Sequence, residues 1–288
     1  MRSRGPGHTP ESDCGSWRLG LNRYPVGGNR RLRPGSLVPS IAAMLTANIL
    51  LLLFAGIAAG FVNSVAGGGS VVTLPVLVEI VGTSLANGTN RVAILMENAV
   101  AAASFHRGRK VPWAFVGPLL IPIILGAGAG AWVATLLSAA TMKRVFGLVI
   151  VLVALSMIVR PSRWMHEGEP RIREPWRSLA FFGIGFYGGF VQAGVGFLLL
   201  VGLVLVEGLG LIRGNAAKVV LILAYTPLSL FLFARAGQVD WVAGATLGIG
   251  SMSGALIASR LAIQRGAGWI RWVVIAAAIA AAMRMLLT

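Results

Sequence analysis

Long uncharged stretches alternate with short basic segments along most of this chain. Three of the uncharged stretches cover residues 41–62, 111–142 and 178–206. A helix needs about 20 mainly apolar residues to cross the hydrocarbon core of a bilayer. The pattern therefore predicts an all-α polytopic membrane protein of about eight transmembrane helices. The predicted spans lie near residues 41–62 with a broken continuation to 81, 91–106, 112–138, 143–160, 178–206, 215–234, 240–262 and 269–286.

The composition supports a membrane protein and changes how the charge is interpreted. Of the 288 residues, 56% are hydrophobic and 12% charged, about half the charged fraction of a soluble domain. The net charge of +16 would suggest nucleic acid in a soluble protein. Here most Arg and Lys residues lie between apolar stretches, where they orient helices against anionic lipid headgroups. We expect membrane lipid as a partner and no nucleic acid.

The chain contains an internal duplication. The sequence VLVE occurs at Val76–Glu79 and again at Val204–Glu207, an offset of 128 residues. An offset near 128 also pairs Asn63 with Gln192, Arg91 with Lys218, Arg107 with Arg235 and Trp113 with Trp241. Secondary transporters are commonly built from such repeats. We predict two homologous four-helix repeats, at 41–160 and 178–288, each opened by a helix that glycines break.

Two basic segments flank the first repeat. Residues 1–40 are predicted to form a disordered tail, and residues 161–177 a linker between the repeats. The positive-inside rule places both in the cytoplasm, with both termini inside the cytoplasmic membrane. Five basic residues then fall on the other side: Lys143, Arg144, Arg260, Arg265 and Arg271. An even number of spans per half gives parallel repeats, whereas re-entrant segments after 62 and 192 give inverted ones. The sequence leaves both arrangements of the repeats open. It also leaves the oligomeric state open, and a homo-oligomer is one of the alternatives.

The segment Asn63–Pro75, NSVAGGGSVVTLP, interrupts the first apolar stretch. Each glycine costs a helix about 1 kcal/mol relative to alanine, so Gly67, Gly68 and Gly69 predict a break. Non-helical backbone at membrane depth is tolerated only inside protein or beside a water-filled cavity. A helix restarting near Ser70 would direct its N-terminus at an anion there. The alternative is that the glycines only permit close packing, which is the better interpretation for Gly126, Gly130, Gly250 and Gly254.

The second repeat contains a weaker version of this break. QAGVGF at 192–197 carries Gly194 and Gly196 and lacks the proline. Breaks at matching positions in two halves are the best sequence indication of a transport site. We include Gln192, Gly194 and Gly196 among the candidate substrate-binding residues, with Asn63 and the first glycine run.

Arg91 and Lys218 each open an apolar stretch, and the repeat relates them. Ionisable residues at membrane depth are costly and often functional, so two cations flanking one anion is one hypothesis. The other is that both side chains reach the headgroups from helix ends. Asn90 and Asn215 lie close by in sequence and would donate hydrogen bonds. Two glutamates, Glu79 and Glu207, are interpreted as structural partners of Arg91 and Lys218. Glu97 is a candidate proton carrier or the neutralising partner of an arginine.

The sequence lacks the signatures of several other functions. It contains no GxxxxGK[ST] and no HExxH motif, and its three histidines are scattered. We expect no enzymatic activity, no cofactor and no metal. NGT at 87–89 fits the short N-glycosylation sequon.

Four segments together resemble the sulfite exporter TauE/SafE family of membrane transporters. They are GFVNSVAGGGSVVTLPVL, ANGTNRVAILMEN, RGNAAKVVLILAYTPLSLFLF and GQVDW, and the resemblance extends from about 45 to 285. It implies two homologous halves that transport a small anion such as sulfite, an organosulfonate or a related carboxylate. The second half departs from the family pattern, because GVGFLLLV lacks the full glycine run and the proline.

The leading functional hypothesis is a secondary transporter or facilitator for such an anion. Export is the simpler direction, because an inside-negative potential favours anion exit by roughly 2.3 kcal/mol per charge per 100 mV. The alternative is a non-transporting membrane scaffold or assembly subunit, which would not explain matching helix breaks in both halves.

Overall fold

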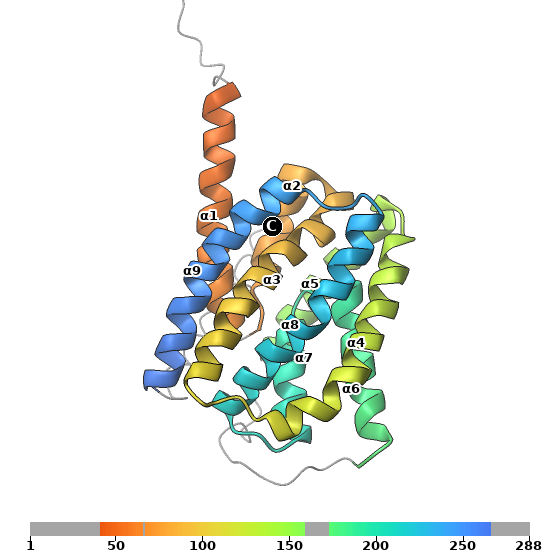
Figure 1. The fold of residues 1–288 in the computed structure, drawn as a ribbon. Helices are drawn as coiled ribbons and strands as arrows, with labels where there is room; N and C mark the ends of the chain where they lie inside the picture. The colour runs from red at the N-terminus through yellow and green to blue at the C-terminus, as the bar shows by residue number, and fades with distance from the viewer. Residues whose placement is uncertain (1–40, 66, 159–172, 266–288) are drawn as a thin grey trace, which may run out of the picture. The chain divides into compact units, whose positions relative to one another are not determined.

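The computed structural model describes residues 41–65, 67–158 and 173–265, and these ranges contain helices and no strands (Figure 1). The elements are α1 (Ile41–Val65), α2 (Ser70–Val81), α3 (Thr83–Arg107), α4 (Trp113–Thr135), α5 (Ala139–Ile158), α6 (Trp176–Phe190), α7 (Val195–Val201), the π-helix η1 (Gly202–Val206), α8 (Leu211–Arg235) and α9 (Trp241–Arg265). Stretches of α1, α4, α8 and α9 are long and apolar enough to cross a membrane. The all-α class is thus confirmed for this part of the chain. The predicted tail 1–40, most of the linker and the last predicted span, 269–286, lie outside the described residues.

Glycines bring two pairs of helices into backbone contact. α1 packs along α9, and α4 packs along α6. A Cβ atom on Gly60 of α1 would lie 2.1 Å from the carbonyl oxygen of Ser251 on α9. A Cβ atom on Gly130 of α4 would lie 1.9 Å from the carbonyl oxygen of Phe186 on α6. No side chain fits at these distances, so the packing interpretation of Gly126, Gly130, Gly250 and Gly254 is confirmed.

The directions of the helices follow from the same contacts. Gly250 and Gly254 of α9 meet Leu53 and Ile57 of α1, respectively, so these two helices run parallel. Successive glycines of α9 meet successive turns of α3, which therefore runs in this direction too. In contrast, α8 runs antiparallel to α3, because Gly88 near the start of α3 lies against Gln238, just beyond the end of α8.

The first glycine break closes a helical hairpin, which we call hairpin 1 (α1 and α2). Only Gly82 separates α2 from α3, and Asn90, in the second turn of α3, donates a hydrogen bond to Ser70 at the start of α2. α2 therefore runs back along α3, which itself runs parallel to α1. With 12 residues, α2 is about 18 Å long, well short of the roughly 30 Å hydrocarbon core.

The second break closes hairpin 2 (α6, α7 and η1). A Cβ on Gly188 of α6 would contact Val195 at the start of α7, and one on Gly202 would contact Phe181 near the start of α6. The two arms are therefore antiparallel. Of the two alternatives from the sequence, the re-entrant one holds in the structure. The prediction that each broken segment continues as one span is wrong, because the chain reverses direction at each break.

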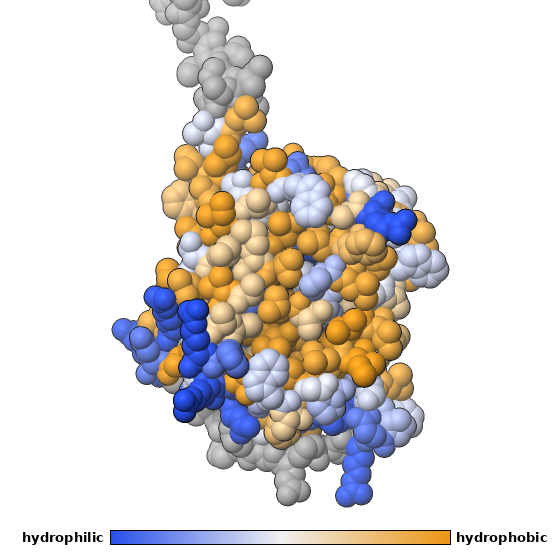
Figure 2. Space-filling view, in the orientation of Figure 1, coloured by the Kyte–Doolittle hydropathy of each residue, from blue (hydrophilic) through white to orange (hydrophobic). Residues whose placement is uncertain are grey.

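These two reversals change which residues share an end of the helical bundle. We call the basic end the one where α3 and α9 end and where α4, α6 and α8 begin. Its described basic residues are Arg107, Arg109, Lys110, Arg173, Arg177, Arg213, Arg260 and Arg265. Figure 2 shows hydrophilic residues gathered where α3 and α9 end, below a broad hydrophobic face.

Two sequence expectations about sidedness are corrected by this arrangement. Arg260 and Arg265 lie at the same end as Arg107 and not on the other side, because α9 ends where α3 ends. Ile41 begins α1 at the end opposite to the start of α6. The tail and the linker are predicted to lie on one side of the membrane. Ile41, just after the tail, and Trp176, at the end of the linker, instead lie at opposite ends of the helical bundle.

Candidate functional site

The two hairpins meet at their glycine breaks. A Cβ on Gly67 would lie 2.2 Å from the carbonyl carbon of Gly196, and one on Gly196 would lie 2.6 Å from the Cα of Gly67. Gly67 also has a φ of +84°, which side chains rarely adopt. In this conformation Gly67 and Gly196 serve close backbone packing. A Cβ on Gly69 would lie 2.3 Å from the carbonyl oxygen of Ala59, so Gly69 also packs closely against α1.

Lys218 of α8 caps the end of α1. Its Nζ donates hydrogen bonds to the carbonyl oxygens of Asn63 (2.8 Å) and Ser64 (3.4 Å) and to Oδ1 of Asn215 (2.8 Å). The last carbonyls of a helix have no partner inside it and carry a partial negative charge. The cation therefore stabilises the end of α1, and all three of its N–H donors are used.

Arg91 of α3 caps the end of α6 in the same way. Its Nη1 donates to the carbonyl oxygen of Gly188 (3.2 Å) and to Oε1 of Gln192 (2.6 Å), and its Nη2 donates to the carbonyl oxygen of Gly189. Nδ2 of Asn87, one turn earlier in α3, donates to the carbonyl oxygen of Phe190 at 2.8 Å. The last three carbonyls of α6 are thus bound by two side chains of α3.

The capping is reciprocal between the two halves of the chain. The cation of the first half caps the broken helix of the second, and the cation of the second half caps the broken helix of the first. Arg91 and Lys218 are each 0% exposed. The alternative that they reach the headgroups is therefore wrong, since both side chains bind carbonyl oxygens inside the bundle.

Asn63 connects Lys218 to Glu97. Its side-chain Nδ2 donates to Oε1 of Glu97, while its carbonyl oxygen accepts from Lys218. Glu97 also accepts from Nδ2 of Asn98 and interacts electrostatically with Lys218. The described hydrogen-bond partners of Glu97 are Asn63 and Asn98, and the cation with which it interacts electrostatically is Lys218 and not an arginine.

The other candidate residues occupy structural positions around the breaks. Asn90 fixes the start of α2, donating to Oγ of Ser70 at 3.2 Å and accepting from Oγ1 of Thr73 at 2.7 Å. Gly68 and Gly69 are buried in the turn before α2, and Gly194 precedes α7 in the left-handed region, at a φ of +69°.

The glutamate pairing expected from the repeat is not found. Oε1 of buried Glu207 accepts from Nε of Arg177 at 2.7 Å, not from Lys218. Glu79 is exposed, and the hydrogen-bond partners that the described residues give Arg91 are all groups of hairpin 2. The reason is again the reversal at each break, which carries Glu207 back to the start of α6.

Some buried polar atoms at this site have no hydrogen-bond partner among the described residues. They are Nε of Arg91, Oδ1 of Asn87 and Nδ2 of Asn215. Arg91 therefore differs from Lys218, because it keeps a donor available after capping its helix. The ring of Phe233 lies over this guanidinium, with Cζ 4.7 Å from the ring centroid.

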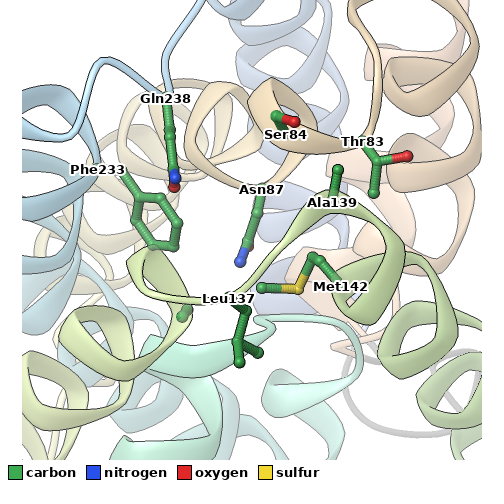
Figure 3. A pocket seen from close by; sticks show the side chains of 9 residues that line it. Thr83, Ser84, Asn87, Leu137, Ala139, Met142, Phe233 and Gln238 are labelled. Atoms are coloured by element: carbon green, nitrogen blue, oxygen red, sulfur yellow. The ribbon is translucent and has the colours of Figure 1, made fainter.

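A pocket opens at the end of the bundle opposite to the basic end, and Figure 3 shows the side chains that line it. It is lined by Thr83, Ser84, Asn87, Ala134, Leu137, Ala139, Met142, Phe233 and Gln238. Two of these lining residues also contact the site described above. Asn87 binds the end of α6, and Phe233 lies against Arg91.

Comparisons with known proteins show the family of this chain. The family model for the sulfite exporter TauE/SafE matches residues 52–285, which include both glycine breaks and both capping cations. This chain belongs to the sulfite exporter TauE/SafE family. A "Probable membrane transporter protein ORF9" of Sinorhizobium sp. is 29% identical over 84% of this chain and 94% of its own length. The "Probable membrane transporter protein YfcA" of Escherichia coli K12 is 27% identical over 77% of this chain and 83% of its own.

A third relative, the "Probable membrane transporter protein" of Haemophilus influenzae, is 27% identical over 79% of this chain and 91% of its own length. No solved structure matches the chain. This TauE/SafE protein is accordingly a membrane transporter, as its family and its relatives are named.

Sequence analysis missed several residues of the site. Asn87 was noticed only as part of a glycosylation sequon, but it is 1% exposed within α3. Tyr225, which accepts a hydrogen bond from Nε2 of Gln192 at 3.3 Å, and Phe233 lie within the span predicted at 215–234 and are not among the predicted site residues. The i, i+4 spacing of Asn87 and Arg91 was a usable signal, because it places both on one helix face.

Proposed function

We propose that this TauE/SafE transporter carries a small, singly charged anion, such as sulfite in its hydrogen form, an organosulfonate or a related carboxylate. The candidate binding region is the crossing of the two hairpins, with Asn63, Arg91, Gln192 and Lys218 around it. The donor left on Arg91 is the group we assign to the anion.

The charge of the buried region is the observation that carries this proposal. The described, buried charged residues are Arg91, Glu97, Glu207 and Lys218, and Glu207 pairs with Arg177. The remaining three give +2 − 1 = +1 in their ordinary ionised forms. Excess positive charge inside the bundle is unfavourable, and the carbonyls at the ends of α1 and α6 that the two cations cap offset part of it. One monovalent anion would compensate it, whereas a cation would add to it.

We further propose that the two halves are inverted repeats. The supporting observations are the equal order of elements, the opposite directions of α3 and α8, and the reciprocal capping of α1 and α6. Inverted repeats allow a site between them to open to either side by motion of one half against the other.

With the basic end facing the cytoplasm, Arg107 is inside and Arg235 outside. The cytoplasmic membrane is the proposed location. Export needs no coupled ion, because the membrane potential favours exit of an anion. For coupled transport Glu97, which lies between Asn63 and Asn98, is the candidate proton carrier.

The test is anion-dependent stabilisation followed by flux. The melting temperature of the purified protein is measured with hydrogensulfite, ethanesulfonate, acetate and sulfate at equal ionic strength, and flux is then measured in liposomes. A ligand at about 100 times its Kd adds roughly 2.7 kcal/mol to the stability of the folded state. We expect stabilisation by a monovalent anion that is lost in Arg91→Gln.

The matched control is Arg235→Gln, which removes the same charge from an exposed residue at the end of α8. It should keep both the stabilisation and the flux. Equal loss in both variants would indicate a nonspecific charge effect and contradict the proposal. Stabilisation by no anion, together with no flux, would favour the scaffold alternative.

A further inference from the structure

Asn87, which lines the pocket of Figure 3, carries a buried hydrogen-bond acceptor that nothing in the described structure satisfies. Nδ2 of Asn87 donates to the carbonyl oxygen of Phe190, which can only accept. The orientation of the amide is therefore fixed, and Oδ1 is the atom left without a partner. Leaving such an atom buried is costly, so a site that keeps one is suited to a ligand that donates to it.

A buried donor without a partner lies one turn away on the same face of α3. This is Nε of Arg91, four residues after Asn87. Phe233 links this donor to the pocket, because its ring lies over the guanidinium of Arg91 and its side chain also lines the pocket. Asn87 thus brings a free acceptor to the residues that line the pocket, and the charged donor lies one turn further along α3.

We infer that Asn87 determines the specificity of transport, by selecting anions that carry an N–H or O–H donor next to their charged group. The anionic group binds Nε of Arg91, and the donor of the same ligand binds Oδ1 of Asn87. The pocket is the route by which the ligand reaches both atoms from the end opposite to the basic end. This inference rests on the proposed function and names a narrower substrate class for it.

The rest of the lining fits a ligand of mixed character. Thr83, Ser84 and Gln238 supply polar groups at the rim, while Met142 and Phe233 supply apolar surface. An anion with a short carbon chain and a terminal hydroxyl would meet both kinds of surface. A purely apolar chain would leave Oδ1 of Asn87 without a donor, and sites that bind a hydroxyl reject analogues that lack it.

The experiment compares two anions of equal charge and nearly equal size. 2-Hydroxyethanesulfonate carries a hydroxyl where propane-1-sulfonate carries a methyl group. Their Kd values are measured by thermal stabilisation of the whole protein in detergent. 2-Aminoethanesulfonate, a zwitterion of zero net charge at pH 7, is added to test whether a net negative charge is required. We expect the hydroxyl compound to bind about tenfold more tightly than the methyl compound. In Asn87→Leu the ratio should fall to about one.

The outcomes separate this inference from the proposed function. If both sulfonates bind the unaltered protein equally well, the inference is overturned and the anion site stands. That result is expected if Oδ1 of Asn87 accepts a hydrogen bond directly from Nε of Arg91. A preference that persists in Asn87→Leu overturns the assignment to this residue. If no sulfonate binds while hydrogensulfite or acetate does, this inference is overturned and the anion site stands; if none of these anions binds, the proposed function itself fails.

A second variant tests the pocket without disturbing the core. Ser84 is exposed at the rim, so Ser84→Trp should fold and narrow the entrance. We expect slower flux and slower binding of 2-hydroxyethanesulfonate by about tenfold. Unchanged rates in this variant would show that the ligand does not enter through the pocket.

Discussion

Gly67 and Gly196 contact each other through their backbones, where the turn of hairpin 1 crosses the turn of hairpin 2. Each belongs to a different half of the chain, and each would clash with the other if it carried a Cβ atom. This contact holds the two breaks together, and the capping cations lie around it. The glycine runs are therefore needed first for packing, whatever they do for a ligand.

Replacement of Gly67 by alanine should destabilise the protein by at least about 3 kcal/mol, because it combines a backbone clash with an unfavourable φ. The free energy of unfolding in detergent is the measurement. Gly183→Ala is the matched control, since Gly183 is exposed on α6 and nothing lies within 4 Å of an added Cβ. If both variants are equally stable, the two breaks do not touch in the protein as purified.

The inverted arrangement predicts that Arg107 and Arg235 are on opposite sides of the membrane. Single cysteines at these two exposed positions, in a Cys14→Ser background, should react with an impermeant thiol reagent from opposite faces of oriented vesicles. Parallel repeats, with each broken segment spanning once, would place both on the same face. Labelling of both from one face would therefore rule out the hairpins.

Lys218 and Glu97 should be energetically coupled through Asn63. Lys218→Gln leaves the end of α1 uncapped and Glu97 buried without its cation, and we expect a loss of about 3 kcal/mol. The double variant with Glu97→Gln should recover part of this loss, giving a coupling energy of about 1–2 kcal/mol. The same cycle between Glu97 and the exposed Arg235 should be additive. Additivity in the first cycle would mean that Asn63 does not transmit the interaction.

Arg177 should stabilise hairpin 2 through Glu207. Removing the arginine leaves a buried carboxylate without a partner, so Arg177→Gln should cost about 3 kcal/mol. The double variant Arg177→Gln, Glu207→Gln should be more stable than the single one. Glu79→Gln, at the repeat-related exposed position, should change stability by less than about 0.5 kcal/mol. A neutral Arg177→Gln would contradict the pairing.

The sequence by itself determined the membrane class, the division into two halves, the positions of the two breaks and the importance of Arg91 and Lys218. Apolar length marked the membrane class, the 128-residue offset marked the two halves, and glycine runs marked both breaks, because these signals are local or periodic. Arg91 and Lys218 stood out because charge at membrane depth is rare.

Only the tertiary structure decided the directions and the partners. A break looks the same in sequence whether the chain continues or reverses, because the choice depends on what packs against the second arm. The reversal at Gly194 brings Glu207 next to Arg177. Lys218 binds the carbonyl oxygens at the end of α1 and not the carboxylate of a glutamate. Asn87 was hidden for the same reason, since an asparagine in a helix gains its role from the carbonyl of Phe190, 103 residues away.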